Sequence, residues 1–298
     1  MKPLFILGIT PRCGSNYLAN LLHRHKEIAR CGIVGEDFLT YHLSKLTHFS
    51  EGVAGSWSEV WKWNEKITPQ SQKQRLNEAL RDGLYRYLSD AVTEEGKYYA
   101  THTPYTHNLP LFKSFFSDAQ LIVLVRSGLD AVESGYIGDF WSYRKGIKLW
   151  SESARRIVQE QQHQSFLLLK YEDLVKNPEK ELTKAFEFLD LNPANYDYEA
   201  LEQLPVYGSS TTKQKDGSFK WQRSTKSKDF NPLNRGANWP PHLRYYLEKN
   251  GGAAMRALGY DFPKKNYSSS QKLAAQKLDM NHKIAQVPVL SRVLKTKG

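Results

Sequence analysis

The sequence predicts a three-layer α/β protein, with a central parallel sheet of about four to five strands and helices on both faces. Short strand-like runs alternate with longer segments that have helical spacing. The strand-like runs are residues 4–9, 98–100, 121–125 and 166–169. They consist almost entirely of apolar residues, whereas the strands of a sheet with one face in water would alternate apolar and polar residues. Continuous apolar strands are typical of parallel sheets that helices cover on both sides.

Helices are expected between these runs, near residues 15–25, 70–93, 128–137, 145–163, 178–189 and 241–256. No internal repeat or low-complexity linker interrupts this alternation before Pro263. A break at Gly259–Pro263 then ends the pattern. We therefore expect one domain over residues 1–262 and a basic extension over residues 263–298.

The net charge is concentrated in that extension. The 298 residues include 42 Lys and Arg against 31 Asp and Glu, which gives a formal charge of +11. Residues 263–298 contain eight of these cations and one acid, so the remaining chain carries only +4. A basic excess suggests anionic partners. We expect a loosely docked or disordered extension rather than a helix on a membrane surface, with a peripheral membrane contact left open.

Composition excludes several other classes of protein. Two cysteines cannot form a disulfide framework, and no Cys/His cluster has the spacing of a metal site. No apolar run approaches the length of a membrane span. The run Leu4–Ile9 is too short for a signal-peptide core and lacks a cleavage site, so we expect a cytoplasmic protein.

The loop after the first strand has the composition of a phosphate cradle. In open parallel sheets, ligands bind beyond the carboxyl ends of the strands. There the chain runs Thr10-Pro-Arg-Cys-Gly-Ser-Asn-Tyr17 into a helix, so Arg12, Ser15 and the helix N-terminus can meet an anion. Five residues separate Gly8 from Gly14 and no Lys follows, unlike a Walker A loop. An ordinary strand-to-helix turn explains this loop equally well.

A second basic loop follows the run 121–125. Arg126 stands directly after this strand, and Ser134 lies two turns along the next helix. Two phosphate sites on one sheet suit a nucleotide that is phosphorylated at both ends of its ribose.

These elements resemble the motifs of the sulfotransferases that use 3′-phosphoadenosine-5′-phosphosulfate (PAPS). Pro11-Arg-Cys-Gly-Ser15 is similar to the loop that wraps the 5′-phosphosulfate, and Arg126…Ser134-Gly-Tyr136 is similar to the 3′-phosphate element. Lys170-Tyr-Glu-Asp-Leu-Val175 resembles the family's Tyr-Glu-Asp-Leu stretch. The resemblance covers residues 4–262, implies the P-loop-NTPase-like sulfotransferase fold, and is closest in style to bacterial carbohydrate or small-molecule and tyrosylprotein sulfotransferases.

The resemblance implies a role for each matching residue. The sulfonate and 5′-phosphate would lie on the loop, and the 3′-phosphate on the second basic element. Two tyrosines would contact the base, although core packing explains them as well, and one arginine in Asn234–Trp239 faintly matches an element that closes over the 3′-phosphate. The implied nucleotide-binding residues are Arg12, Cys13, Gly14, Ser15, Asn16, Tyr17, Arg126, Ser134, Tyr171 and Arg235.

Sulfonate transfer also needs a general base and a cation at the leaving oxygen. By the resemblance, Arg12 supplies the cation. Glu36 lies in a Gly-Glu context similar to that of tyrosylprotein and bacterial carbohydrate enzymes. His102 lies in Thr-His-Thr-Pro, similar to the cytosolic enzymes, although Ala100 replaces their Lys. We slightly favour Glu36 as the base, with His102 orienting or assisting the acceptor.

The function expected from the sequence is therefore transfer of a sulfonate from PAPS, by in-line displacement and without a metal, to a hydroxyl or less readily an amine. The acceptor would be a glycan, a lipid or a small molecule, and the Glu36 context favours a glycan or small alcohol. Its walls are expected in residues 37–97 and 205–235. Trp57, Trp61 and Trp63 suit either an acceptor pocket or, more commonly for such spacing, core and lid packing, and residues 208–221 suit a mobile loop or a lid. The alternatives are a P-loop-like small-molecule kinase and a nucleic-acid-binding protein. The missing Walker lysine and the mildly basic domain argue against them.

Overall fold

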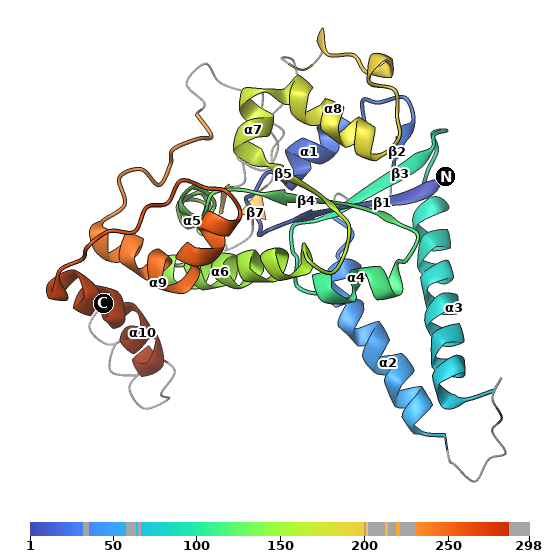
Figure 1. Cartoon of the computed structure of the whole chain (residues 1–298), viewed down its shortest axis with the longest axis horizontal. Coiled ribbons are helices and arrows are strands. Elements are labelled where there is room, and N and C mark those ends of the chain that lie inside the picture. Colours follow the sequence, from blue (N-terminus) through green and yellow to red (C-terminus); the bar gives the residue numbers. More distant parts are fainter. Residues whose placement is uncertain are drawn as a thin grey trace.

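The computed structural model describes residues 1–31, 36–57, 64, 67–199, 201, 212–213, 219–220 and 231–285, and all structural statements concern these residues. Five parallel strands form the central sheet, in the order β2-β3-β1-β4-β5 (Figure 1). They are β1 (Lys2–Gly8), β2 (Ile28–Arg30), β3 (Tyr98–Thr103), β4 (Gln120–Val125) and β5 (Leu167–Lys170). The predicted α/β class and its parallel sheet are confirmed. A separate antiparallel pair joins β6 (Thr212–Lys213) and β7 (Phe219–Lys220).

Helices cover both faces of the sheet. In Figure 1, α1, α7 and α8 lie on one side and α4, α6 and α9 on the other, while α2 and α3 project as a pair from one end. The α-helices are α1 (Ser15–Leu22), α2 (Leu43–Gly55), α3 (Pro69–Ser89), α4 (Leu109–Phe115), α5 (Gly128–Ile137), α6 (Tyr143–Glu160), α7 (Tyr171–Lys176), α8 (Pro178–Phe188), α9 (Pro241–Ala257) and α10 (Ser269–Ala285). Short 3₁₀ turns occur at η1 (Thr40–His42) and η2 (Pro193–Asn195).

The six predicted helices correspond to α1, α3, α5, α6, α8 and α9, with ends that differ by a few residues. The sequence analysis did not expect β2, α2, α4, α7 or α10. Three of these elements are short, and a segment of three to seven residues is too short to show a clear period.

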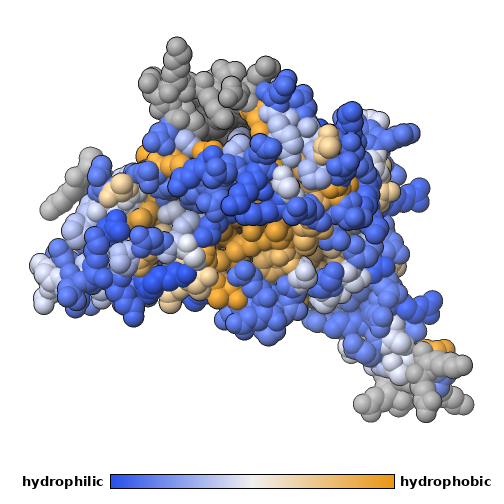
Figure 2. All heavy atoms as spheres, turned by 45° about the horizontal axis from the view of Figure 1, so that its top comes forward, coloured by the Kyte–Doolittle hydropathy of each residue, from blue (hydrophilic) through white to orange (hydrophobic). Residues whose placement is uncertain are grey.

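The core lies on both sides of β1, the central strand. Leu4, Phe5 and Ile6 are fully buried there. Trp150 of α6 is also fully buried, and its indole N–H donates to the carbonyl oxygen of Arg126 at 2.9 Å. Packing against α6 thus fixes the backbone at the carboxyl end of β4. The outer surface drawn in Figure 2 is mostly hydrophilic, with an apolar area near its middle.

The described part of the basic extension is a docked helix, whereas the sequence favoured a loosely docked or disordered segment. Ala275 of α10 is 1% exposed, and Asp279 accepts from Arg144 Nε at 2.8 Å and from Tyr246 Oη at 2.7 Å. Lys148 Nζ also lies 3.0 Å from the Asp279 carboxylate. The single acid of the extension therefore ties α10 to α6 and α9.

Strand order places the loop after β1 at the ligand-binding edge of the sheet. The chain leaves β1 through α1 towards β2 and β3 on one side, and β4 pairs with the other side of β1. Open α/β sheets bind ligands at the point where the order of the strands reverses direction in this way. Along the part of the chain that the structure describes, no helix is both long and apolar enough to cross a membrane.

Gly14 supplies a backbone conformation that this loop requires. It has φ 98°, and a Cβ at this position would lie 2.4 Å from the Tyr171 ring. We expect Gly14→Ala to lower the free energy of unfolding by about 2 kcal/mol or more, because a left-handed conformation and a ring displacement are both costly. Urea unfolding measures the change.

Gly83→Ala is the matched control for this variant. Gly83 lies in the exposed part of α3 with open space around its Cβ position, so alanine there should stabilise the helix by about 0.5–1 kcal/mol. Equal stability of the two variants would contradict the assigned loop geometry.

Candidate active site

The loop between β1 and α1 is a tight, partly strained turn. Arg12 has φ 70° and Gly14 has φ 98°, so two of its residues adopt the left-handed region. The N–H of Cys13 donates to the carbonyl oxygen of Thr10 at 3.2 Å. Helix α1 starts at Ser15, and the first N–H groups of a helix have no partner within it. The loop therefore brings backbone donors and the positive helix end to one place.

Three arginines converge beside this loop, and two of them lie at one buried hydroxyl. Arg12 Nε lies 3.4 Å from the Oγ atom of Ser134, and Arg235 Nη1 lies 3.5 Å from the same atom. Arg126 Nη1 donates to the carbonyl oxygen of Arg12 at 2.7 Å. Ser134 is 3% exposed. The structure thus brings together four of the residues that the sequence analysis singled out for phosphate binding.

The electrostatics of this cluster favour an anion. Burial, followed by the charges of Arg235 and Arg126, lowers the pKa of Arg12 to about 10. Burial and then Arg126 also lower the pKa of Arg235. Arg126 Nε and Thr10 Oγ1 are buried and have no hydrogen-bond partner among the described residues. Buried polar atoms are nearly always paired, so these two suit the oxygens of a bound ligand.

Arg235 reaches the cluster because a carboxylate holds its segment in place. Asp130, near the start of α5, accepts from the backbone N–H of Asn234 at 3.0 Å and of Gly236 at 3.1 Å. Trp239 Nε1 donates to Glu133 Oε2 at 2.6 Å. The segment that faintly matched the 3′-phosphate element is therefore anchored on the helix that carries Ser134.

The two predicted base-contacting tyrosines lie against the loop. Tyr17 is 8% exposed and Tyr171 is 6% exposed, with ring centroids 6.2 Å apart in an edge-on arrangement. The guanidinium of Arg126 lies 4.7 Å from the centroid of the Tyr171 ring. Both rings pack within the protein here, and Tyr171 also closes the space beside Gly14.

Glu36 lies beside the start of α1. Asn16 Nδ2 lies 3.4 Å from Glu36 Oε1. Burial raises the pKa of Glu36, the hydrogen bond from Asn16 opposes this shift, and the neighbouring charge of Asp37 adds to it. A carboxylate with a raised pKa is a stronger base than an exposed one, which suits proton abstraction.

His102 lies on the neighbouring strand β3, and its carbonyl oxygen accepts from the N–H of Asp37, the residue after Glu36, at 3.0 Å. It is 7% exposed, and its Nε2 has no hydrogen-bond partner among the described residues. It pairs with Ile6 of β1 in the sheet. Its side chain lies on the same face of β3 as that of Tyr98, whose hydroxyl donates to the carbonyl oxygen of Leu189. Burial, and then the charge of Arg30, lower the pKa of His102 to about 4. No hydrogen bond of the described residues joins His102 to Glu36.

The remaining predicted residues are distributed as follows. Cys13 is fully buried and Ser15 is 4% exposed, so both contribute mainly through the backbone of the loop. Trp57 lies at the end of α2, while Trp61, Trp63 and most of 208–221 lie outside the described residues. The aromatic wall and the lid that the sequence suggested therefore stay predictions.

Several residues of the site escaped sequence reasoning. Asp130 and Glu133 act on a segment about 100 residues away, and only their places in the helix after Arg126 hinted at a role. Asp37 accepts hydrogen bonds from Thr101 and Thr103 of β3. Phe140 lies 5.0 Å from the Arg12 guanidinium. Each of these contacts depends on tertiary placement.

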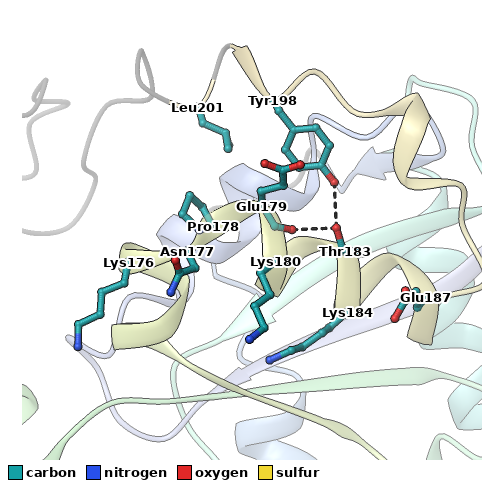
Figure 3. Close-up of a pocket in the computed structure, with 10 residues that line it drawn as sticks. All are labelled: Lys176, Asn177, Pro178, Glu179, Lys180, Thr183, Lys184, Glu187, Tyr198 and Leu201. Carbon is teal, nitrogen blue, oxygen red and sulfur yellow. Dashed lines mark hydrogen bonds between the residues drawn. The ribbon is translucent and has the colours of Figure 1, made fainter.

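A separate surface hollow of about 790 Å³ lies along α7 and α8. Figure 3 shows the side chains of Lys176, Lys180 and Lys184 on one side, and Tyr198 with Leu201 on the other. Thr183 Oγ1 bridges the carbonyl oxygen of Glu179 and the Tyr198 hydroxyl. None of the predicted site residues lines this hollow, so it is distinct from the arginine cluster.

The fold and the cluster define an α/β protein with a group of arginines at the end of its central strand. The sequence profile of the sulfotransferase family matches residues 3–195, and the chain belongs to this family. It is an enzyme that transfers sulfate.

Its relatives are distant. The chain is 24% identical to a putative protein-tyrosine sulfotransferase of Caenorhabditis briggsae over 64% of its own length, and spans 66% of that protein, just under two thirds. It is 23% identical to protein-tyrosine sulfotransferase A of Caenorhabditis elegans over 95% of its length and 74% of the relative. Among solved structures, the sulfotransferase domain of the Synechococcus PCC 7002 olefin synthase shares 22% identity, with 94% of each chain covered and a TM-score of 0.44.

The buried histidine gives this site a measurable pH signature. The folded-state pKa of His102, about 4, lies below the ordinary value of 6.5, so the unfolded chain binds the proton first as the pH falls. Stability should therefore decrease from pH 6.5 towards pH 4, by at most about 3 kcal/mol from this residue. His102→Gln should remove that part of the slope in urea unfolding at several pH values.

The exposed His163 provides the control, because His163→Gln should leave the slope unchanged. The half-buried His23, whose pKa burial lowers to about 3, should keep a similar slope in both variants. An unchanged slope in His102→Gln would show that His102 is accessible to protons in the folded protein.

Proposed function

We propose that this enzyme transfers the sulfonate of PAPS to an acceptor hydroxyl, or less readily to an amine, by in-line displacement within a domain over residues 1–262. The observation that carries the proposal is the convergence of three arginines, with Arg12 and Arg235 beside the Ser134 hydroxyl and Arg126 on the carbonyl oxygen of Arg12. Three clustered cations need more than one negative charge to balance them, and a nucleotide with phosphate groups on both sides of its ribose supplies this charge.

The two phosphate positions follow from the two strand ends. The backbone of Cys13 and Gly14, with Ser15 and Asn16 at the helix start, would hold the 5′-phosphate and the sulfonate. Arg126, Ser134 and Arg235 would hold the 3′-phosphate, and the unpaired Nε of Arg126 is a donor available for it. Tyr17 and Tyr171 would border the base.

The chemistry needs a charge at the leaving oxygen and a proton acceptor at the attacking one. As the acceptor oxygen bonds to sulfur, the bond from sulfur to the 5′-phosphate oxygen breaks, and negative charge grows on that oxygen. Arg12, fixed at the loop, would stabilise it. Glu36 would take the acceptor proton, because Asn16 connects it to the start of α1. His102 would assist from the neighbouring strand end.

Nucleotide binding is the first test of this proposal. Adenosine 3′,5′-bisphosphate should raise the melting temperature of the purified protein. Arg126→Ala should weaken its binding by about 10- to 100-fold, since a charged hydrogen bond contributes roughly 1.5–3 kcal/mol. Isothermal titration gives the dissociation constants.

Two further variants make the nucleotide test specific. Ser134→Ala removes only the central hydroxyl and should weaken binding by about tenfold without affecting folding. Arg86→Ala removes a charge from the exposed surface of α3 and should leave binding unchanged. Absence of any stabilisation by the nucleotide in the native protein would refute the PAPS assignment.

The base assignment is tested by turnover. With labelled PAPS and a working acceptor, Glu36→Gln should reduce kcat by about 10²- to 10⁴-fold while nucleotide affinity is retained, because the amide cannot accept the proton. His102→Gln should have a smaller effect. If Glu36→Gln retains full turnover and His102→Gln does not, the roles of the two residues are reversed.

A further inference from the structure

Next to Glu36, three aromatic side chains form a cluster that we call the aromatic platform: Phe38, Tyr41 and Tyr105. The ring centroids of Tyr41 and Tyr105 are 4.8 Å apart, and that of Phe38 lies 6.4 Å from each. Phe38 is 40% exposed. His107 extends the cluster, with its ring centroid 5.4 Å from that of Tyr41.

Phe38 is held in a conformation that costs free energy. Its φ of 53° is left-handed, which is rare for a bulky residue. The adjacent Asp37 fixes this conformation, since it accepts from the N–H of Leu39 at 2.7 Å, from Thr101 Oγ1 at 2.7 Å and from Thr103 Oγ1 at 2.9 Å. Backbone strain that the surroundings maintain is concentrated at functional sites. Here the strain presents an apolar ring to solvent.

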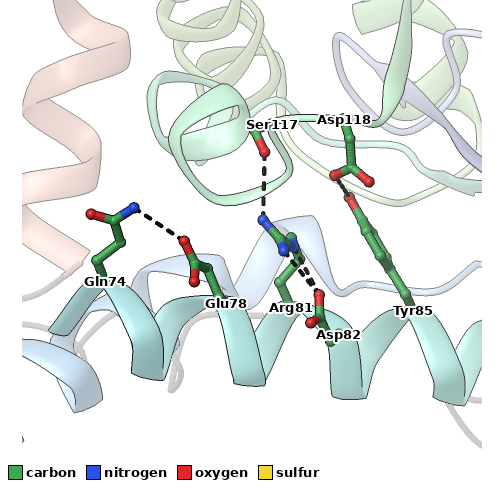
Figure 4. A network of polar contacts seen from close by, with 7 residues as sticks. All are labelled: Gln74, Glu78, Arg81, Asp82, Tyr85, Ser117 and Asp118. Carbon is green, nitrogen blue, oxygen red and sulfur yellow. Dashed lines mark hydrogen bonds and ion pairs between the residues drawn. The ribbon is translucent and has the colours of Figure 1, made fainter. Parts of the chain in front are cut away.

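The rest of the platform is also fixed. Asn108 Nδ2 donates to the carbonyl oxygens of Thr40 at 3.0 Å and Tyr41 at 2.8 Å, which joins the loop that carries Tyr105 to η1. Beyond α4, Arg81 and Tyr85 of α3 bond to Ser117 and Asp118, as Figure 4 shows. Asn108 therefore braces the platform directly, whereas the Arg81 and Tyr85 contacts hold the segment that follows α4.

The platform continues the line of groups that begins at the phosphate loop. Asn16 at the start of α1 contacts Glu36, and Phe38 follows Glu36 by two residues. Tyr105 is close enough for the Glu36 carboxylate to add, after burial and Tyr41, to the rise in its pKa. Sulfonate loop, base and platform thus follow one another, and a ring on the platform lies beside the base.

The charge around the platform limits what it can bind. Among the described residues, no lysine or arginine lies over any of its three rings. The hydroxyls of Tyr41 and Tyr105 make no hydrogen bond to described residues. Two available hydroxyls and three ring faces suit a flat, uncharged ring that carries few polar groups.

The proton chemistry favours an aromatic hydroxyl for a separate reason. A phenol loses its proton with a pKa near 10, whereas the pKa of water is 15.7 and an alkyl alcohol lies in that range. A carboxylate is a weak base even when burial strengthens it. The difference in pKa between base and acceptor hydroxyl is therefore smaller for a phenol than for an alkyl alcohol.

We propose that Phe38, Tyr41 and Tyr105 bind the flat ring of an aromatic acceptor whose hydroxyl receives the sulfonate. The inference rests on the proposed function and adds the acceptor class, which differs from the glycan or small alcohol that the Glu36 context favoured. The acceptor oxygen bonds to sulfur, its proton passes to the Glu36 carboxylate, and adenosine 3′,5′-bisphosphate leaves with the electron pair of the broken bond.

The test uses the full chain, labelled PAPS and two probes, 2-naphthol and methyl β-galactopyranoside. The native protein should sulfonate 2-naphthol and not the galactoside. Phe38→Leu should raise the KM for 2-naphthol by about threefold to tenfold, which is the range of an aromatic pair contact. Phe49→Leu changes a phenylalanine that is 54% exposed on α2 and should leave KM unchanged.

A second variant separates binding from folding. Phe38→Gly removes the ring and also relieves the left-handed strain, so its melting temperature should equal or exceed that of the native protein. Its KM for 2-naphthol should still rise. A variant of unchanged KM would show that Phe38 is structural and would overturn the inference.

The possible failures are distinguishable. If the protein binds adenosine 3′,5′-bisphosphate but sulfonates the galactoside in preference to 2-naphthol, or neither probe, the acceptor class is wrong and the proposed function stands. If the nucleotide does not bind, the proposed function fails and this inference fails with it.

Discussion

The repulsion among three clustered arginines, of which Arg126 is buried and Arg12 and Arg235 are half-buried, is the constraint on which the site depends. They come from distant parts of the chain. Arg12 and Arg235 have to be brought to the Ser134 hydroxyl, and Arg126 to the carbonyl oxygen of Arg12. The parallel sheet supplies the first two, because β1 and β4 are hydrogen-bonded neighbours whose carboxyl ends share one edge. Asp130 supplies the third by holding the backbone on both sides of Arg235. The fold therefore stabilises a charge arrangement that only an anionic ligand fully compensates.

Holding such a cluster together costs stability, and the surrounding contacts show how the protein offsets it. Arg126 donates to the carbonyl oxygen of Arg12 and lies over the Tyr171 ring, so backbone and aromatic groups share its charge. Trp150 fixes the backbone of Arg126 from the opposite side. A site that is organised before its ligand arrives loses less entropy on binding. The loss of folding stability is therefore matched by tighter binding of the ligand.

Whether a feature could be predicted from the sequence depended on how far apart in the chain its interacting residues lie. The sheet, Arg12 and Arg126 were predictable because continuous apolar strands imply parallel pairing, and parallel pairing aligns strand ends. The sulfotransferase family and the enzyme class followed from motifs at those ends. Asp130 and Asp37 were not predictable, since their partners are far away in sequence and a lone carboxylate resembles any surface acid. The strand β2, with three residues, lacked a readable period.

The proposed donor and acceptor sides of the site are built by different means. The donor side consists of charged groups at the ends of central strands, where the geometry follows from the sheet itself. The acceptor side consists of aromatic rings on the segment after Glu36 and the loop after β3, and Asp37 connects the two through Thr101 and Thr103. A change of ring at position 38 leaves the strand ends untouched, whereas a change at Arg126 disturbs the sheet edge. In the proposed site, acceptor choice can therefore vary while nucleotide binding is kept.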